Sequence, residues 1–157
     1  MSETGSFRHE QASGNADAST GGSPMTINMT YDEQAKALIT TITDTITFHE
    51  MLSHNEDVAS ALRSSEIHIR IMDLRGLTAA EIDTDQLDAL AQSNLQVILD
   101  NPVKDLLVLA SGDLQYGLCR MWEAFARLGD QELRIFRTKE ALNAYLADKY
   151  GLERPLL

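Results

Sequence analysis

The sequence predicts an α/β fold in which a small mixed β-sheet packs against helices. Two kinds of strand are the evidence. The segment "LLVLA" (106–110) is a continuous apolar run, typical of a parallel strand covered on both faces. The segment "EIHIRIMDL" (66–74) alternates, with isoleucines on one side and His68, Arg70 and Met72 on the other. A buried central strand beside partly open neighbours favours a small mixed sheet over a large doubly wound one.

The chain divides into a short polar tail and one domain. Residues 1–24 are rich in Ser, Gly, Ala, Thr and Asp, so they cannot bury enough apolar surface to offset ordering. This composition predicts a disordered tail. Residues 25–157 are predicted to form a single domain, and a chain of 157 residues suits one domain of ordinary size.

The domain is predicted to open with a hairpin and a helix. The Thr- and Ile-rich runs "TINMTYDE" and "AKALITTIT" flank a polar turn at 32–36. The helix that follows begins with "TFHE", in which Thr47 and Glu50 have the spacing of a capping box.

Three further helices are predicted between and after the remaining strands. One starts at Thr84, with an apolar stripe at 87, 90, 91, 95 and 98. The next is expected to have Ser111 as its N-cap and a stripe at 114, 118, 121, 125 and 128. In the last helix, Thr138 is the expected N-cap and Gly151 the terminator. The predicted order is β-β-α-β-α-β-α-β-α.

Composition excludes several classes of function. A formal net charge of −11 argues against a nucleic-acid partner, because phosphate contacts need clustered Lys and Arg. The single cysteine, Cys119, cannot form an internal disulfide. No apolar run is long enough for membrane insertion, and the amino terminus lacks the apolar core of a signal peptide. We therefore expect a cytoplasmic protein.

No catalytic or metal-binding constellation emerges from the residues, and no cofactor is expected. His49 and His54 lie five residues apart, which is not the spacing that directs two imidazoles to one metal on a helix. Ser111 follows a strand and precedes a helix, but "LASGD" lacks the glycines of a nucleophile elbow. Cys119, beside an apolar stripe, is interpreted as a buried small hydrophobe.

The best candidate site lies at the predicted carboxyl edge of the sheet. Asp73 and Arg75 stand where the strand "EIHIRIMDL" is expected to end, and the buried Asp73 needs partners such as loop N–H groups or Arg75. They are predicted to line a shallow ligand or partner cleft with residues from the second strand–helix junction, namely Ser111, Gly112, Tyr116 and Arg120. The alternative is a structural hydrogen-bonding role for the same residues.

Two segments resemble the SpoIIAA-like group of the STAS domain superfamily. They are "IRIMDLRGLT" (69–78) and the long run from 108 to 146. In the second, "QYGLCRMWEAF", "RIFR" and "KEALNAYL" correspond to the group's characteristic helix, strand end and terminal helix. The resemblance implies the same order of elements and a role in protein interaction.

STAS domains that antagonise anti-sigma factors carry a switch serine in a "DSSG"-like motif. The corresponding stretch here holds Glu81, Ile82, Asp83 and Thr84, so the switch serine is absent. Thr84 could accept a phosphate, although helix N-capping already explains it. The leading hypothesis is a non-enzymatic, regulatory STAS-like domain that binds a protein partner, with a homodimer as one form of it. The alternative is a small-molecule or lipid-binding carrier of the same architecture.

Overall fold

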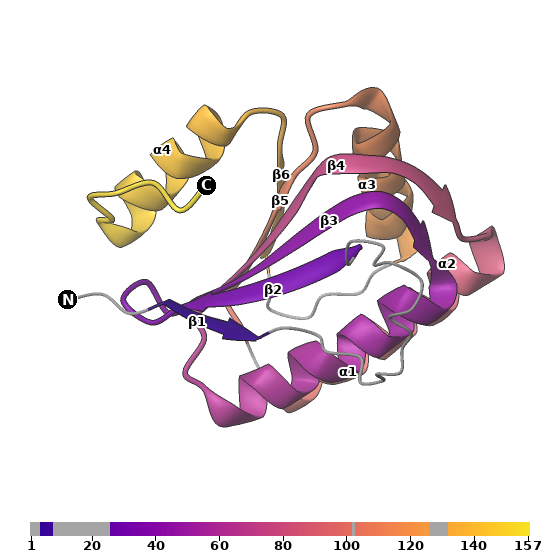
Figure 1. The fold of residues 1–157 in the computed structure, drawn as a ribbon, viewed down its shortest axis with the longest axis horizontal. Helices are drawn as coiled ribbons and strands as arrows, with labels where there is room; N and C mark the ends of the chain where they lie inside the picture. Colours follow the sequence, from indigo (N-terminus) through magenta and orange to yellow (C-terminus); the bar gives the residue numbers. More distant parts are fainter. Residues whose placement is uncertain (1–3, 8–25, 102, 126–131) are drawn as a thin grey trace, which may run out of the picture.

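The computed structural model describes residues 4–7, 26–101, 103–125 and 132–157. In this part of the chain, six strands form one sheet in sequence order: β1 (Thr4–Phe7), β2 (Ile27–Asp32), β3 (Ala37–Thr47), β4 (Ile69–Glu81), β5 (Asp105–Leu109) and β6 (Glu132–Phe136). The helices are α1 (Phe48–Ser64), α2 (Thr84–Asp100), α3 (Asp113–Phe125) and α4 (Lys139–Tyr150). Strands β1 to β3 pair antiparallel and β3 to β6 pair parallel, which confirms the predicted mixed α/β sheet (Figure 1).

The first strand corrects the prediction of a disordered tail. Residues 4–7 pair antiparallel with β2, in a register that sets Thr4 opposite Asp32 and Phe7 opposite Met29. The edge of β2 offers backbone N–H and C=O groups, with which the backbone of residues 4–7 pairs. The tail prediction is therefore wrong for these four residues, and 1–3 and 8–24 lie outside the described residues.

The structure confirms three predictions that depend on short sequence patterns: the β2–β3 turn, the capping box of α1 and the two ends of α4. The turn between β2 and β3 lies within 32–36, as the hairpin pattern indicates. At α1, the Thr47 side chain accepts from the Glu50 N–H while the Glu50 carboxylate accepts from the Thr47 N–H, completing the capping box. Thr138 caps α4, and Gly151 ends it with φ 67°, a left-handed conformation that favours glycine.

Two predicted caps are one residue out of place. The N-cap of α2 is Asp83, which forms a reciprocal capping box with Gln86, and Thr84 is the first helical residue. Helix α3 begins at Asp113, so Gly112 rather than Ser111 precedes it, and the Gly112 carbonyl accepts from the Tyr116 N–H. Position 128 of the predicted α3 stripe lies outside the described residues.

The helices cover the two faces of the sheet unequally. Leu142 and Leu146 of α4 pack against Ile69, Ile71 and residues of β5 on one face. Helices α1, α2 and α3 lie side by side on the other face, where they cover two further apolar clusters. Figure 1 shows α4 on the opposite side of the sheet from α1 and α2. The β4 strand is thus covered on both faces, which corrects the prediction of a partly open strand.

Strands β3 and β4 extend beyond the rest of the sheet as a curved pair. Their pairing continues to Thr47 and Glu81, with register shifts between Thr41 and Thr43 and between Asp44 and Thr45. Gly76 lies opposite Thr43, and a Cβ at Gly76 would meet the Thr43 methyl group at 2.7 Å, so the close approach requires glycine. Asp73, placed at a strand end by the sequence pattern, is therefore within β4. This pair carries several residues that line the candidate site.

The apolar stripe predicted for α3 is only partly correct. Leu114 and Met121 are 45% and 46% exposed, while Gln115 and Cys119 form the buried line. Gln115 is held inward because its side-chain amide donates to the Leu77 carbonyl of β4 at 2.7 Å. With Gln115 bonded to the sheet, Leu114 and Met121 of the expected stripe are partly exposed to solvent.

Candidate ligand-binding cavity

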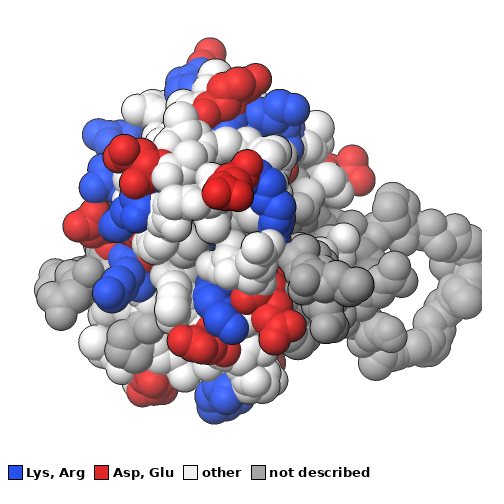
Figure 2. All heavy atoms as spheres, turned by 90° about the vertical axis from the view of Figure 1, so that its left-hand side faces the viewer, with Lys and Arg blue, Asp and Glu red and all other residues white. Residues whose placement is uncertain are grey.

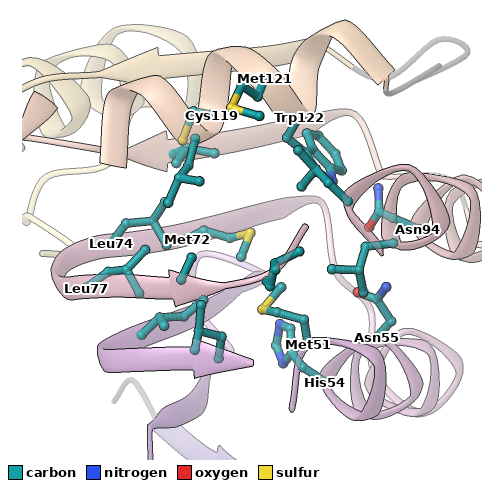
Figure 3. Close-up of a pocket in the computed structure, with 18 of the residues that line it drawn as sticks. Met51, His54, Asn55, Met72, Leu74, Leu77, Asn94, Cys119, Met121 and Trp122 are labelled. Atoms are coloured by element: carbon teal, nitrogen blue, oxygen red, sulfur yellow. The ribbon is translucent and has the colours of Figure 1, made fainter. Parts of the chain in front are cut away.

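A cavity of about 130 Å³ lies between the sheet and helices α1, α2 and α3. Its walls are mostly apolar, and Figure 3 shows side chains from all these elements converging on it. The residues that give the cavity its soft, apolar surface include Met51, Met72, Leu74, Leu77, Met121 and Trp122. Because Met121 is about half exposed, it places one side of the cavity near the surface.

A positively charged side chain borders this apolar space. Arg70 of β4 lines the cavity and is 4% exposed. Its guanidinium donates to the Asn94 Oδ1 atom at 3.0 Å, and no carboxylate of the described residues lies within ion-pair distance of it. Burial lowers the pKa of Arg70 to about 10, so it remains charged at neutral pH. A buried cation without a counter-charge is unusual, since desolvation strongly disfavours it.

Asn94 adds a second donor at the same end of the cavity. Its Oδ1 must face Arg70, because a guanidinium can only donate. The Nδ2 amide is then directed elsewhere, and this buried nitrogen has no hydrogen-bond partner among the described residues. Figure 3 shows Asn94 and Asn55 extending from α2 and α1 toward the cavity. Arg70 and Asn94 therefore place neighbouring hydrogen-bond donors in the lining of a mostly apolar cavity.

Sequence reasoning did not select either residue. Arg70 belongs to the alternating strand, whose polar side was interpreted as facing solvent. Asn94 occupies the position of α2 that faces the sheet, where the predicted stripe placed Leu95 instead. A helical repeat of 87, 90, 91, 94 and 98 would have identified a polar residue among buried apolar ones.

His54 also lines the cavity but belongs to a different polar contact. It is buried, and its Nε2 atom lies 3.4 Å from the Thr40 hydroxyl of β3. Within the described residues, no group of three or more His, Cys, Asp or Glu side chains is arranged to hold a metal ion.

Cys119 lines the cavity as the buried hydrophobe that the sequence predicts. Burial, together with the nearby Glu123 carboxylate, raises the pKa of its thiol to about 12. The sulfur is therefore a neutral thiol at physiological pH, and it lacks the thiolate character of a nucleophile.

Asp73 and Arg75 form the ion pair that the sequence suggests. The Asp73 Oδ1 atom accepts from the Arg75 backbone N–H and Nε, and Oδ2 accepts from Nη2 at 2.8 Å. The hydrogen bond to Asp73, with an additional contribution from Glu140, raises the pKa of Arg75. This bidentate pair uses both carboxylate oxygens of Asp73 within the protein.

Ser111, Gly112 and Tyr116 meet at the β5–α3 junction around a residue that was not predicted, Arg137. Its guanidinium donates to the Ser111 carbonyl at 3.3 Å and to the Asp113 carboxylate at 2.9 Å. It also lies 4.6 Å from the centre of the Tyr116 ring. No hydrogen bond or ion pair between described residues links this group to Asp73 or Arg75.

Among the described residues, no hydrogen bond or ion pair connects Arg120 or Thr84 to that junction. Arg120 pairs with Glu123 at 2.8 Å on the exposed side of α3, as the helical spacing indicates. Thr84 is an exposed first-turn residue of α2. The shallow cleft of predicted site residues therefore stays a hypothesis, whereas the cavity is a separate feature on the α1–α3 side.

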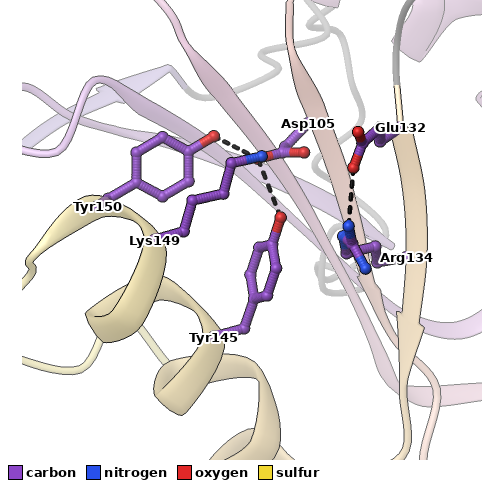
Figure 4. A network of polar contacts seen from close by, with 6 residues as sticks. All are labelled: Asp105, Glu132, Arg134, Tyr145, Lys149 and Tyr150. Atoms are coloured by element: carbon purple, nitrogen blue, oxygen red, sulfur yellow. Dashed lines mark hydrogen bonds and ion pairs between the residues drawn. The ribbon is translucent and has the colours of Figure 1, made fainter.

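The α4 side carries a second buried charge, Asp105 at the start of β5. It accepts from Lys149 at 2.9 Å, from the Tyr150 hydroxyl, and from the Tyr145 hydroxyl at 3.4 Å (Figure 4). Burial alone would raise the pKa of Asp105, but hydrogen bonds from Tyr150 and Lys149 outweigh it and hold the pKa below its usual value. The pKa of Lys149 is raised by the same bond. This network attaches α4 to the sheet.

The surface seen from the left of Figure 1 carries charges of both signs. Figure 2 shows Lys and Arg interspersed with Asp and Glu on this face, without a continuous basic area. Such a face offers no phosphate-binding surface of the kind that nucleic acids need. No helix among the described residues is long and apolar enough to cross a membrane.

Comparisons with known proteins concern the fold. No protein-family model matches the chain, and no curated protein matches it. The chain is similar to the solved structure of the unphosphorylated anti-sigma factor antagonist SpoIIAA, with 6% identity, a TM-score of 0.49, and coverage of 73% of this chain and 92% of that one. It is also similar to an uncharacterised DUF3478-family protein from Shewanella loihica, with 17% identity, a TM-score of 0.47, and coverage of 92% and 93%. The second of these structures is described as having a SpoIIAA-like fold.

Proposed function

We propose that this domain is a non-catalytic binder of a small, largely apolar molecule, which it holds in the cavity between the sheet and α1–α3. The cavity itself carries the proposal. A volume of about 130 Å³ approaches the roughly 150 Å³ of an engineered apolar cavity that binds benzene, so a single ring or a short alkyl chain fits it. This proposal corresponds to the alternative that the sequence analysis gives, a small-molecule carrier, with the site on the face of the sheet that α1–α3 cover.

The chemistry of the lining suits the binding of an apolar molecule. The Cys119 thiol is neutral, and Arg70 remains protonated, so neither is suited to accept a proton at neutral pH. The three methionines, Met51, Met72 and Met121, are unbranched and adaptable, which suits an apolar guest of variable shape.

Methyl NMR of the full chain with labelled methionines tests this function directly, with toluene as the probe. We expect the methyl signals of Met51, Met72 and Met121 to shift in a saturable manner. Met29 provides an internal control, because it is buried in a different apolar cluster and does not line the cavity. Unchanged signals at all four methionines, or equal shifts that include Met29, would contradict the proposal.

Self-association through α3 is a second candidate function. Leu114 and Met121 are exposed and lie seven residues apart, about two helical turns, so they share one side of the helix. Exposed apolar side chains on one helical face are suited to contact a second copy of the chain. Sedimentation equilibrium should show a dimer that dissociates in the double variant L114E/M121E. A monomer at every concentration would exclude this candidate.

A further inference from the structure

We infer that the ligand of this cavity is a small apolar carboxylate, whose anionic head binds Arg70 and Asn94 while its body occupies the apolar space. This inference rests on the proposed function, because it specifies the chemical class of the same ligand. It follows from three features of the cavity: an uncompensated charge, an unused donor and a limited volume.

The uncompensated charge is the guanidinium of Arg70. The neutral Asn94 oxygen is its one side-chain hydrogen-bond partner in the described part of the chain, so most of its N–H groups have no acceptor there. The other buried Asp and Arg side chains of the described residues are paired: Asp73 with Arg75, Asp105 with Lys149, and Asp32 with Arg154. Arg70 differs from these residues and borders the cavity, which indicates that a bound ligand supplies its counter-charge.

The unused donor is the Nδ2 amide of Asn94. This nitrogen is buried and lacks a partner among the described residues, and Asn94 is one of the residues that line the cavity. Since Oδ1 of the same side chain accepts from Arg70, the amide hydrogens and the remaining guanidinium hydrogens lie at one end of the cavity. A carboxylate accepts several such hydrogen bonds through two oxygens and matches the planar geometry of a guanidinium.

The limited volume defines the rest of the ligand. About 130 Å³ accommodates a single aromatic ring or a short branched chain, but not a long acyl chain. The neighbouring side chains, Met72, Leu118 and Trp122, offer apolar and aromatic contacts and no further cation. Aromatic or short-chain monocarboxylates therefore fit better than dianions such as phosphate esters.

The test compares three probes of one size and different charge: benzoate, toluene and benzylamine. Binding to the full chain is followed at the cavity methionines, with Met29 as the control. We expect benzoate to bind about tenfold or more tightly than toluene, because hydrogen bonds to a charged group contribute more than neutral ones. We expect no binding of benzylamine, whose ammonium would lie against Arg70.

Two variants assign the preference to the polar end of the cavity. Arg70→Met removes the charge and retains an unbranched side chain, so benzoate should lose its advantage while toluene still binds. Asn94→Asp supplies an internal carboxylate for Arg70, so benzoate affinity should fall about tenfold or more with little change for toluene. If Arg70→Met does not fold, the Asn94→Asp variant still tests whether the polar end of the cavity binds the carboxylate.

The outcomes separate this inference from the proposed function. Binding of toluene as tight as that of benzoate in the wild type would overturn the carboxylate assignment and leave the cavity function in place. Retention of the benzoate preference in either variant would also overturn it. If neither benzoate nor toluene shifts the methyl signals of the cavity methionines, the proposed function fails and the carboxylate inference fails with it.

Discussion

Arg70 and Asp105 are buried charges on neighbouring strands of one sheet, yet their surroundings differ. The β4–β5 register sets Asp105 opposite Ile69 and Arg70 opposite Leu106. Ile69 and Asp105 belong to the side covered by α4, and Arg70 and Leu106 to the side covered by α1–α3. Asp105 meets a cation and two hydroxyls, whereas Arg70 meets one amide and a cavity.

This difference distinguishes a structural charge from one available to a ligand. Three side chains of α4 converge on Asp105, so its charge fixes the position of that helix on the sheet. Arg70 has no comparable ion pair within the described residues. We propose that a bound ligand offsets the desolvation free energy of its charge. Removing each charge should therefore change stability in opposite directions.

Removal of the carboxylate at Asp105 is expected to give the largest effect. Asp105→Ala should lower the free energy of unfolding by about 3 kcal/mol, at the lower end of the range for breaking a buried ion pair. The lower end applies because Lys149 is 38% exposed and can turn to water. Urea denaturation provides the measurement. The nearby Glu132→Gln, which breaks an exposed pair with Arg134, is the matched control and should have little effect.

Removal of the charge at Arg70 is expected to act in the opposite direction. Without ligand, Arg70→Met should raise the free energy of unfolding by about 1 kcal/mol, because relief of the uncompensated charge exceeds the loss of the Asn94 hydrogen bond. Urea denaturation of ligand-free protein measures the difference. A clear destabilisation would show that Arg70 has a structural role like that of Asp105.

The contribution of Asp105 to stability should depend on pH, and this is the smallest of the expected effects. The folded-state pKa of Asp105 lies below its unfolded value, so its contribution is present above that value and disappears as pH falls through the folded pKa. The stability difference between wild type and Asp105→Asn should be complete at pH 5 and should narrow below about pH 4. Denaturation curves at several acidic pH values measure this difference, and a constant gap would contradict the assignment.

The sequence predicts the locally encoded parts of the fold. The hairpin, the Thr47–Glu50 capping box and the Thr138 and Gly151 ends of α4 all depend on residues close in the chain. The Asp73–Arg75 pair was also predictable, since two residues on the same strand can meet without knowledge of the tertiary structure.

The cavity could not be predicted from the same patterns. Alternation of apolar and polar residues distinguishes the two sides of a strand, but a polar side can face either solvent or an internal cavity. Arg70 was interpreted as the first and proves to be the second. The partners of Asp105 follow it by 40 to 45 residues, so their convergence depends on how α4 packs.

Thermal unfolding of wild type and Arg70→Met, with and without benzoate, tests the central claim most directly. Without benzoate, the variant should unfold at the higher temperature. Benzoate at about one hundred times its dissociation constant should stabilise the wild type by about 2.7 kcal/mol and leave the variant nearly unchanged. Equal stabilisation of both proteins, or no stabilisation of the wild type, would contradict the assignment of Arg70 as the anion-binding residue.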